Sequence, residues 1–163
     1  MDYMYAPWRT HYFTEKQQGC VFCAISLQAQ KDEEHNVLYR DANCFIVMNR
    51  YPYSPGHIMV IPHFHTDAVE ELSTEIWLHI SAIVQCCVRM LKNGIGAQGV
   101  NLGMNLGKSG GAGIAEHIHY HVLPRWQGDT NFITTIADTR VYGTDFEEIY
   151  CRLKKLIPEY IKC

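Results

Sequence analysis

The chain has little charge and no excess of basic residues. Charged side chains make up 19% of its 163 residues, and 14 Lys and Arg stand against 17 Asp and Glu, for a net charge of −3. This balance excludes a protein that coats nucleic acid by electrostatic attraction alone, so we expect no nucleic-acid partner. A hydrophobic content of 47% also excludes an intrinsically disordered chain.

Long apolar runs are also missing. The most apolar stretch, residues 76–91, is interrupted by His79, Gln85 and Arg89, so it is too short and too polar to span a bilayer. The N-terminus carries Asp2 and scattered aromatics in place of a basic and then an apolar segment, so we expect no secretory leader. Seven cysteines in such a chain favour free or metal-bound thiols. We therefore expect a cytoplasmic protein without membrane contact.

No repeat, low-complexity tract or long linker divides the chain. Its length suits a single domain. We predict one domain over residues 1–163, with an N-terminal arm at 1–19, a core at 20–126 and a C-terminal extension with a helix at 127–163.

Apolar patterns between turn residues predict four strands. Two short apolar runs on either side of a Pro- and Gly-containing turn are typical of an antiparallel pair. Two further segments alternate apolar and polar residues, as strands do. The predicted strands are Cys44–Met48, Ile58–Ile61, Val100–Leu106 and His117–Leu123.

Two helices are predicted beside these strands. Ser73 is a plausible N-cap for a long amphipathic helix that ends at Lys92–Gly94. A capping box formed by Thr144 and Glu147 predicts a C-terminal helix that stops near Pro158. Strand pairs with two separated helices indicate an α+β fold on an antiparallel sheet.

Three histidines in alternation are the strongest chemical signal. His117, His119 and His121 point to one face of a strand, with Ile118, Tyr120 and Val122 on the other. One reading is a plain polar row that faces solvent. Two functional readings compete with it: a catalytic metal held by the imidazoles, or a nucleophilic histidine whose geometry the other two fix.

A glycine-rich loop precedes the histidines and helps to choose between a catalytic metal and a nucleophilic histidine. The segment 107–113 offers backbone amides uncovered by side chains, together with Lys108, Ser109 and the consecutive glycines Gly110 and Gly111. These features are typical of a loop that binds an anion. A phosphate held next to a histidine favours phosphoryl or nucleotidyl transfer.

These motifs closely resemble the signature of the histidine triad (HIT) superfamily of nucleotide hydrolases and transferases. The resemblance covers residues 20–126 and implies a HIT-like fold, an antiparallel sheet with a long central helix and a C-terminal helix. Within the superfamily the chain is similar to the bacterial diadenosine tetraphosphate (Ap4A) phosphorylase-like, or ATP adenylyltransferase-like, proteins. The segments that carry this narrower similarity are Pro7–Arg9, Asn49–Tyr53, Ala115–His117 and Pro124–Phe132.

The resemblance implies a role for each matching residue. His119 corresponds to the nucleophile that attacks the α-phosphorus, and His121 to a residue that contacts the phosphate or assists the leaving group. The phosphate contacts fall on Asn105, Ser109 and the loop, and the ribose contact on Asn49. Trp126 is either a core residue or a base-stacking wall.

The resemblance also implies substrates. It favours cleavage of Ap4A with inorganic phosphate to ATP and ADP through a nucleotidyl-histidine, and the alternative uses water on Ap4A, AMP esters or AMP phosphoramidates. Gly113 stands where many of the hydrolases carry glutamine, and this departure is compatible with phosphate as acceptor. Mg²⁺ is compatible with a polyphosphate substrate, although no acidic cluster demands it. Homodimers or higher homo-oligomers are expected.

Cys20 and Cys23 form a C-x-x-C pair, which by itself fits either thiol–disulfide chemistry or half of a metal site. A structural Zn²⁺ needs four N or S ligands. Related branches of the superfamily pair such cysteines with two histidines, which here match His65 and the first triad histidine, His117; His63 is the reserve ligand. The alternative is a pair of buried thiols.

Cys44, Cys86, Cys87 and Cys151 fall in apolar patterns and are expected in the core, and His57 is interpreted as structural.

Overall fold

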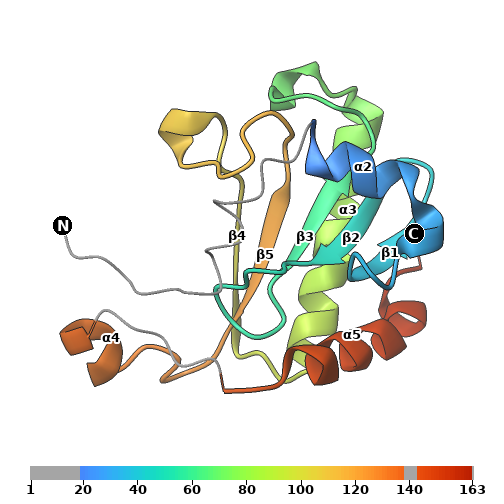
Figure 1. Ribbon diagram of the computed structural model, residues 1–163. Coiled ribbons are helices and arrows are strands. Elements are labelled where there is room, and N and C mark those ends of the chain that lie inside the picture. Colours follow the sequence, from blue (N-terminus) through green and yellow to red (C-terminus); the bar gives the residue numbers. More distant parts are fainter. Residues whose placement is uncertain (1–18, 138–142, 163) are drawn as a thin grey trace.

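The computed structural model describes residues 19–137 and 143–162 and has an α+β architecture. Its centre is a five-stranded antiparallel sheet with the strand order β1-β2-β3-β5-β4 (Figure 1). This confirms the fold class predicted from the sequence. The predicted arm lies outside the described residues except for Gly19. The strands are β1 Val37–Arg40, β2 Cys44–Met48, β3 Ile58–Pro62, β4 Gly99–Gly103 and β5 Tyr120–Arg125.

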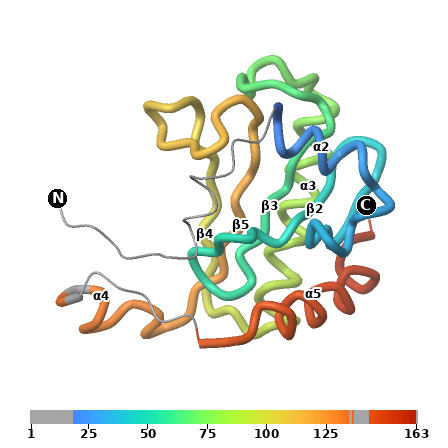
Figure 2. The backbone as a smooth tube through the Cα atoms, in the orientation of Figure 1, coloured from blue at the N-terminus to red at the C-terminus, as the bar shows by residue number. Residues whose placement is uncertain are grey.

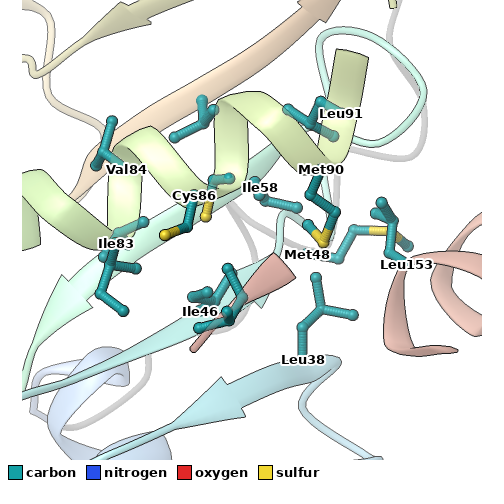
Figure 3. Close-up of a cluster of buried hydrophobic side chains, with 14 of the residues drawn as sticks. Leu38, Ile46, Met48, Ile58, Ile83, Val84, Cys86, Met90, Leu91 and Leu153 are labelled. Atoms are coloured by element: carbon teal, nitrogen blue, oxygen red, sulfur yellow. The ribbon is translucent and has the colours of Figure 1, made fainter. Parts of the chain in front are cut away.

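Two helices, α3 (Thr74–Arg89) and α5 (Phe146–Tyr160), contribute to the main core on one face of the sheet. Alternate strand side chains point into this core, and Figure 3 shows them against the end of α3 and against α5. Leu38, Ile46, Met48 and Ile58 are each at most 2% exposed. Because each buries a whole apolar side chain, each contributes about 1.5–3 kcal/mol to folding.

A shorter helix, α2 (Val21–Leu27), packs on the opposite face of the sheet. Its buried side chains Phe22 and Ile25 lie in a second cluster with Phe45, Met59 and Ile61 from β2 and β3. Met59 pairs with His121 across β3 and β5. Directly paired residues of antiparallel strands share a face, so the second face is also the face of the triad.

The start of α3 confirms the predicted cap. The Ser73 hydroxyl accepts a hydrogen bond from the Ile76 amide at 3.2 Å. The helical conformation continues past Arg89 as a π-helical turn over Met90–Gly94, which matches the predicted end.

The C-terminal helix differs from its prediction at both ends. The N-cap is Asp145, whose carboxylate accepts from the Glu148 amide at 3.0 Å, so the predicted box at Thr144 and Glu147 is one residue too early. Pro158 lies inside the helix, which ends at Tyr160. A proline in the last turn removes one amide, and the final turn still closes through a bond from the Ile161 amide to the Ile157 carbonyl at 2.9 Å.

Two predicted strands are shifted, and one pairing explains both. Gly103 of β4 pairs with His121 of β5, so residues after Gly103 face the chain before β5 and leave the ladder. That chain is not a strand, because the Ile118 amide donates to the Thr66 carbonyl at 2.9 Å. The predicted strand 100–106 therefore stops at Gly103, and the predicted strand 117–123 begins only at Tyr120.

One strand and two α-helices were not predicted: β1, α2 and the short helix α4 (Phe132–Ala137). Figure 2 shows that α2 and the loop between β4 and β5 lie toward the same end of the sheet. Cys44, Cys86 and Cys87 are buried as predicted, whereas Cys151 is exposed because the core-facing side of α5 carries Ile149, Tyr150, Leu153 and Ile157. Within the described ranges, no helix combines the length and the apolarity that a bilayer crossing requires.

Candidate active site and metal cluster

The three triad histidines lie where the chain enters β5. His117 is fully buried and His119 is 6% exposed, while His121, inside the strand, is half-buried. Phe22 of α2 contacts both leading rings, with ring centroids 5.6 Å from His117 and 5.1 Å from His119. Ile118 and Val122 point the other way, into the main core. The alternation predicted from the sequence is confirmed, and the reading as a solvent-facing polar row is wrong.

Backbone carbonyls fix the protonation of the first two rings. A carbonyl oxygen only accepts, so the ring nitrogen that faces it carries the proton. His117 donates from Nε2 to the Pro62 carbonyl at 3.0 Å, which leaves Nδ1 with its lone pair. His119 donates from Nδ1 to the His117 carbonyl at 2.9 Å, which leaves Nε2 with its lone pair.

Burial keeps both of these rings neutral. Removal from water lowers the pKa of His117 and the pKa of His119, because the protonated ring loses its hydration. For His119 the bond to the His117 carbonyl opposes this effect. At neutral pH, His119 therefore presents an unprotonated, held nitrogen, which is what a nucleophilic imidazole needs.

His57, interpreted from the sequence as a structural histidine, is part of the same cluster. Its Nδ1 accepts from the Tyr53 backbone amide and from the Asn49 side-chain amide, both at 3.2 Å. The proton of His57 is therefore on Nε2, and it is donated to Nδ1 of His121 at 2.9 Å. This leaves the remaining proton of His121 on Nε2. The chain of bonds thus places a donor on His121 beside a lone pair on His119.

These two rings are also neutral. Burial lowers the pKa of His57 to about 3, with further lowering by His121 and His119. Burial likewise lowers the pKa of His121 to about 4, with a smaller contribution from His119. The ring centroids of His119 and His121 are 4.8 Å apart, so the lone pair and the donor N–H can act on one phosphorus centre.

The four predicted zinc ligands converge beside His117. Cys20 Sγ lies 3.3 Å from His117 Nδ1, Cys23 Sγ lies 3.2 Å from His65 Nδ1, and the two Nδ1 atoms are 3.3 Å apart. All four ligand atoms lie within 4.8 Å of one another. His63, the reserve ligand, is instead bonded to Ser26 and to the Asp41 carbonyl.

The spacing of these atoms fits a tetrahedral Zn²⁺ ion. Standard Zn–N and Zn–S bond lengths give tetrahedral edges of about 3.4 Å for N to N and about 3.6 Å for N to S. The lone pair on His117 Nδ1 points at the other ligand atoms, an arrangement that a cation between them stabilises. Burial and the neighbouring Cys20 raise the pKa of the Cys23 thiol, and a bound cation would oppose that rise.

The glycine-rich loop is open to solvent at its tip. Lys108–Gly110 form a short 3-10 turn with exposed side chains, and the amide of Gly111 is used inside the loop, where it donates to the Lys108 carbonyl at 3.0 Å. The loop folds back on Asn105, because an added Cβ at Gly110 would lie 3.7 Å from the Asn105 carbonyl carbon.

Two residues expected to contact the nucleoside have protein partners. The Asn49 side chain bonds to His57 and accepts from the Tyr51 amide at 3.0 Å. The Trp126 indole donates to the Gly96 carbonyl at 3.0 Å and packs against the main core, just beyond the end of β5 opposite the triad. Whether they also contact a substrate stays a prediction.

Comparisons with known proteins agree with this geometry. The model of the HIT domain family matches residues 30–128. A Mycobacterium tuberculosis protein named AP-4-A phosphorylase is 44% identical over 110 residues, which are 68% of this chain and 56% of that protein. This chain therefore spans only about half the length of that relative.

Solved structures show the same fold. A Zn-bound histidine triad family protein from Mycobacterium smegmatis superposes with a TM-score of 0.70 at 31% identity, over 86% of this chain and 94% of the other. A hypothetical histidine triad nucleotide-binding protein from Sulfolobus tokodaii has a TM-score of 0.67 at 28% identity, over 88% and 92% of the two chains.

Proposed function

Since the chain belongs to the HIT domain family, we propose that it is a nucleotidyl transferase or hydrolase that cleaves adenine dinucleoside polyphosphates. The preferred reaction converts Ap4A and inorganic phosphate to ATP and ADP. The proposal rests on Nε2 of His119, which is unprotonated and has a free lone pair. The ring is buried and neutral, and its other nitrogen is bonded to the His117 carbonyl. The name of the Mycobacterium tuberculosis relative supports the choice of substrate.

The first step forms a covalent intermediate. Nε2 of His119 attacks the α-phosphorus of Ap4A, a P–N bond forms, and the P–O bond to the leaving ATP breaks. The N–H on Nε2 of His121 donates a hydrogen bond to the leaving oxygen and stabilises the charge that develops there. Lys108, Ser109 and the amide of Gly110, together with Asn105, hold the phosphate oxygens, and Gly111, whose own amide is bonded to the Lys108 carbonyl, shapes the loop around them.

The second step transfers AMP to the acceptor. An oxygen of inorganic phosphate attacks the phosphorus, the P–N bond breaks, ADP leaves, and His119 regains its lone pair. The alternative acceptor is water, with Ap4A, AMP esters or AMP phosphoramidates as substrates. Gly113 supports phosphate as the acceptor, because this position carries no side chain where many of the hydrolases have glutamine.

We further propose that Cys20, Cys23, His65 and His117 hold one Zn²⁺ ion. Four protein ligands make a closed site, so the ion would supply a structural cross-link that ties α2 to the start of the triad. His117 passes this constraint on, because its carbonyl orients the His119 ring. The Zn-bound relative from Mycobacterium smegmatis supports the assignment. Mg²⁺ is a further candidate, as a companion of the polyphosphate.

The proposal extends to the assembly of the protein. α5 packs against β1, which supports a single domain over residues 1–163. Among residues 19–137 and 143–162, β4 pairs with β5 alone and lies at an edge of the sheet, and this edge position supports a homodimer or a higher homo-oligomer. Light scattering of the purified full chain tests this assembly. We place the protein in the cytoplasm, without nucleic-acid or membrane partners.

One incubation tests the proposed function. The full-length protein is mixed with Ap4A, with and without inorganic phosphate, and the products are separated by ion-exchange chromatography. We expect ATP and ADP in phosphate, and an AMP adduct on His119 by mass spectrometry of the quenched enzyme. ATP and AMP at a rate that does not depend on phosphate would favour the water alternative, and no cleavage of Ap4A would reject the proposed substrate.

A further inference from the structure

A hollow of about 210 Å³ opens beside His121 on the triad face of the sheet. Tyr53, from the turn between β2 and β3, lines it together with Leu123 of β5 and with Gly103 and Asn105 from β4 and the residues that follow. The hollow therefore begins at a proposed phosphate ligand and continues past a proposed catalytic residue.

Glycine at position 103 opens this space. Gly103 pairs directly with His121, and Asn101 with Leu123, so a side chain at 103 would stand on the same face as the His121 ring. The backbone of Gly103 is not in the left-handed region, and an added Cβ would meet no atom within 4 Å. Neither backbone conformation nor packing requires glycine here; its effect is to leave room beside His121.

Tyr53 forms the wall of the hollow. Its backbone amide is bonded to His57, which fixes the position of the residue. Its ring centroid lies 4.9 Å from that of His57 and 6.1 Å from that of His121, and the residue is 44% exposed. An aromatic face is thus presented next to the reacting groups.

The charge of the hollow restricts what it can bind. Among the described residues that line it, none carries a positive charge. Arg125, the next residue after Leu123 on this face of β5, is bonded to Asp129 at 2.6 Å and to Asn101 at 2.7 Å. A polyphosphate without a nucleoside would gain little binding free energy in such a space, because no cation is there to pair with it. A flat, neutral group would gain binding free energy by stacking on the aromatic wall.

We propose that the hollow binds the base of the second nucleoside, the one that departs with the leaving group, with Tyr53 as the stacking wall and Gly103 as the floor. This inference rests on the proposed function and names the part of the substrate that sets specificity. Asn105 lies against the phosphate loop, and from Gly103 to Asn101 the strand β4 extends a further two residues, about 7 Å, away from that loop. The loop holds the phosphates, and the nucleoside beyond them lies along this path.

The test compares Ap4A with adenosine 5′-tetraphosphate, which has the same phosphate chain and no second nucleoside. Attack by His119 on the two compounds gives the same AMP adduct, with ATP or inorganic triphosphate as the leaving group. The readout is the ratio of their kcat/KM values, in the full-length enzyme and in Tyr53→Ala. Adenosine 5′-tetraphosphate carries extra charge on its terminal phosphate. This charge affects the kcat/KM ratio equally in the unmodified enzyme and in Tyr53→Ala, so it cancels when the two ratios are compared.

We expect the preference for Ap4A to fall about tenfold in Tyr53→Ala, mainly through KM, the loss typical of removing one base–aromatic stack. Tyr53→Phe keeps the aromatic face and should keep most of the preference. Leu78→Ala, at a residue of α3 that is 61% exposed, is the surface control and should leave the ratio unchanged. An unchanged ratio in Tyr53→Ala would overturn the inference.

A second variant tests the floor. Gly103→Val adds a branched side chain beside His121, where the backbone accepts any residue, and should lower kcat/KM for Ap4A more than for adenosine 5′-tetraphosphate. Equal losses on both compounds would contradict the assignment. Failure of the proposed function is distinguishable, because the unmodified enzyme would then form no AMP adduct from either compound.

Discussion

Nε2 of His57 donates a hydrogen bond to Nδ1 of His121 across 2.9 Å, so a histidine outside the triad is bonded directly to it. The two residues are 64 positions apart and meet because β3 pairs with β5, in the register that places Ile58 opposite Val122. His57 is itself held by the Tyr53 amide and the Asn49 side chain. The turn before β3 therefore determines which nitrogen of His121 faces the substrate.

His57 is predicted to act through His121 without touching substrate. In His57→Gln the bond to Nδ1 of His121 is lost or misplaced, so we expect kcat for Ap4A to fall about 10- to 100-fold with little change in KM. Steady-state kinetics, with thermal unfolding to verify folding, measure this. The same kcat in a folded variant would show that His121 keeps its orientation unaided.

The buried histidines make stability depend on pH. The pKa of His57 is lowered to about 3, so the unfolded chain takes up a proton near the ordinary pKa of 6.5, and the folded chain does not until about pH 3. Stability contributed by the neutral ring is thus present above pH 6.5 and is lost as the pH falls. At pH 5 the loss from His57 alone is about 2 kcal/mol. Urea unfolding at pH 7.5 and pH 5 measures it.

His57→Gln provides the comparison for this measurement. Glutamine does not titrate, so the difference in unfolding free energy between the two pH values should shrink by about the same 2 kcal/mol. An identical pH dependence in both proteins would contradict neutral burial of His57. His121 titrates in the same direction, with its pKa lowered to about 4, and retains part of the effect in the variant.

The sequence predicted what depends on local pattern. Alternation placed the triad on one face and Ser73 was identified as a cap, whereas His65 and His117 were assigned as partners of the C-x-x-C pair through the resemblance to the HIT superfamily. His57 has no such signal, because a lone histidine after a glycine is identified as functional only by the register of β3 and β5. The four-residue strand β1 was also missed, and its pairing with β2 is irregular between Val37 and Tyr39.

The corrected cap of α5 gives a stability prediction. The Asp145 carboxylate accepts from the Glu148 amide at 3.0 Å, so Asp145→Ala should lower the free energy of unfolding by about 1 kcal/mol. Thr144→Ala is the matched control and should change it by less than about 0.5 kcal/mol. Chemical denaturation of the two variants measures both, and a larger loss at Thr144 would restore the capping box predicted from the sequence.

Zinc content should depend on the C-x-x-C pair. In Cys20→Ser the metal loses a thiolate that lies 3.3 Å from His117 Nδ1, so we expect zinc to fall from about one ion per chain to a small fraction of that, with a lower melting temperature. Mass spectrometry of the metal in the purified protein gives the count. The exposed Cys151 offers the control: Cys151→Ser should keep its zinc. Equal zinc in both variants would contradict the site.

The last prediction separates covalent from metal-centred chemistry. His119→Ala removes the attacking nitrogen and leaves all four zinc ligands in place, so we expect the AMP adduct to disappear and turnover to fall about 10⁴-fold or more, with Ap4A still bound and zinc retained. Equilibrium binding and metal analysis accompany the rate measurement, with His35→Ala, in the segment before β1, as a histidine control. If a metal-bound water were the nucleophile, activity would depend on the metal and not on His119. Chelation would then abolish turnover of the unmodified enzyme without unfolding it, and His119→Ala would keep substantial activity.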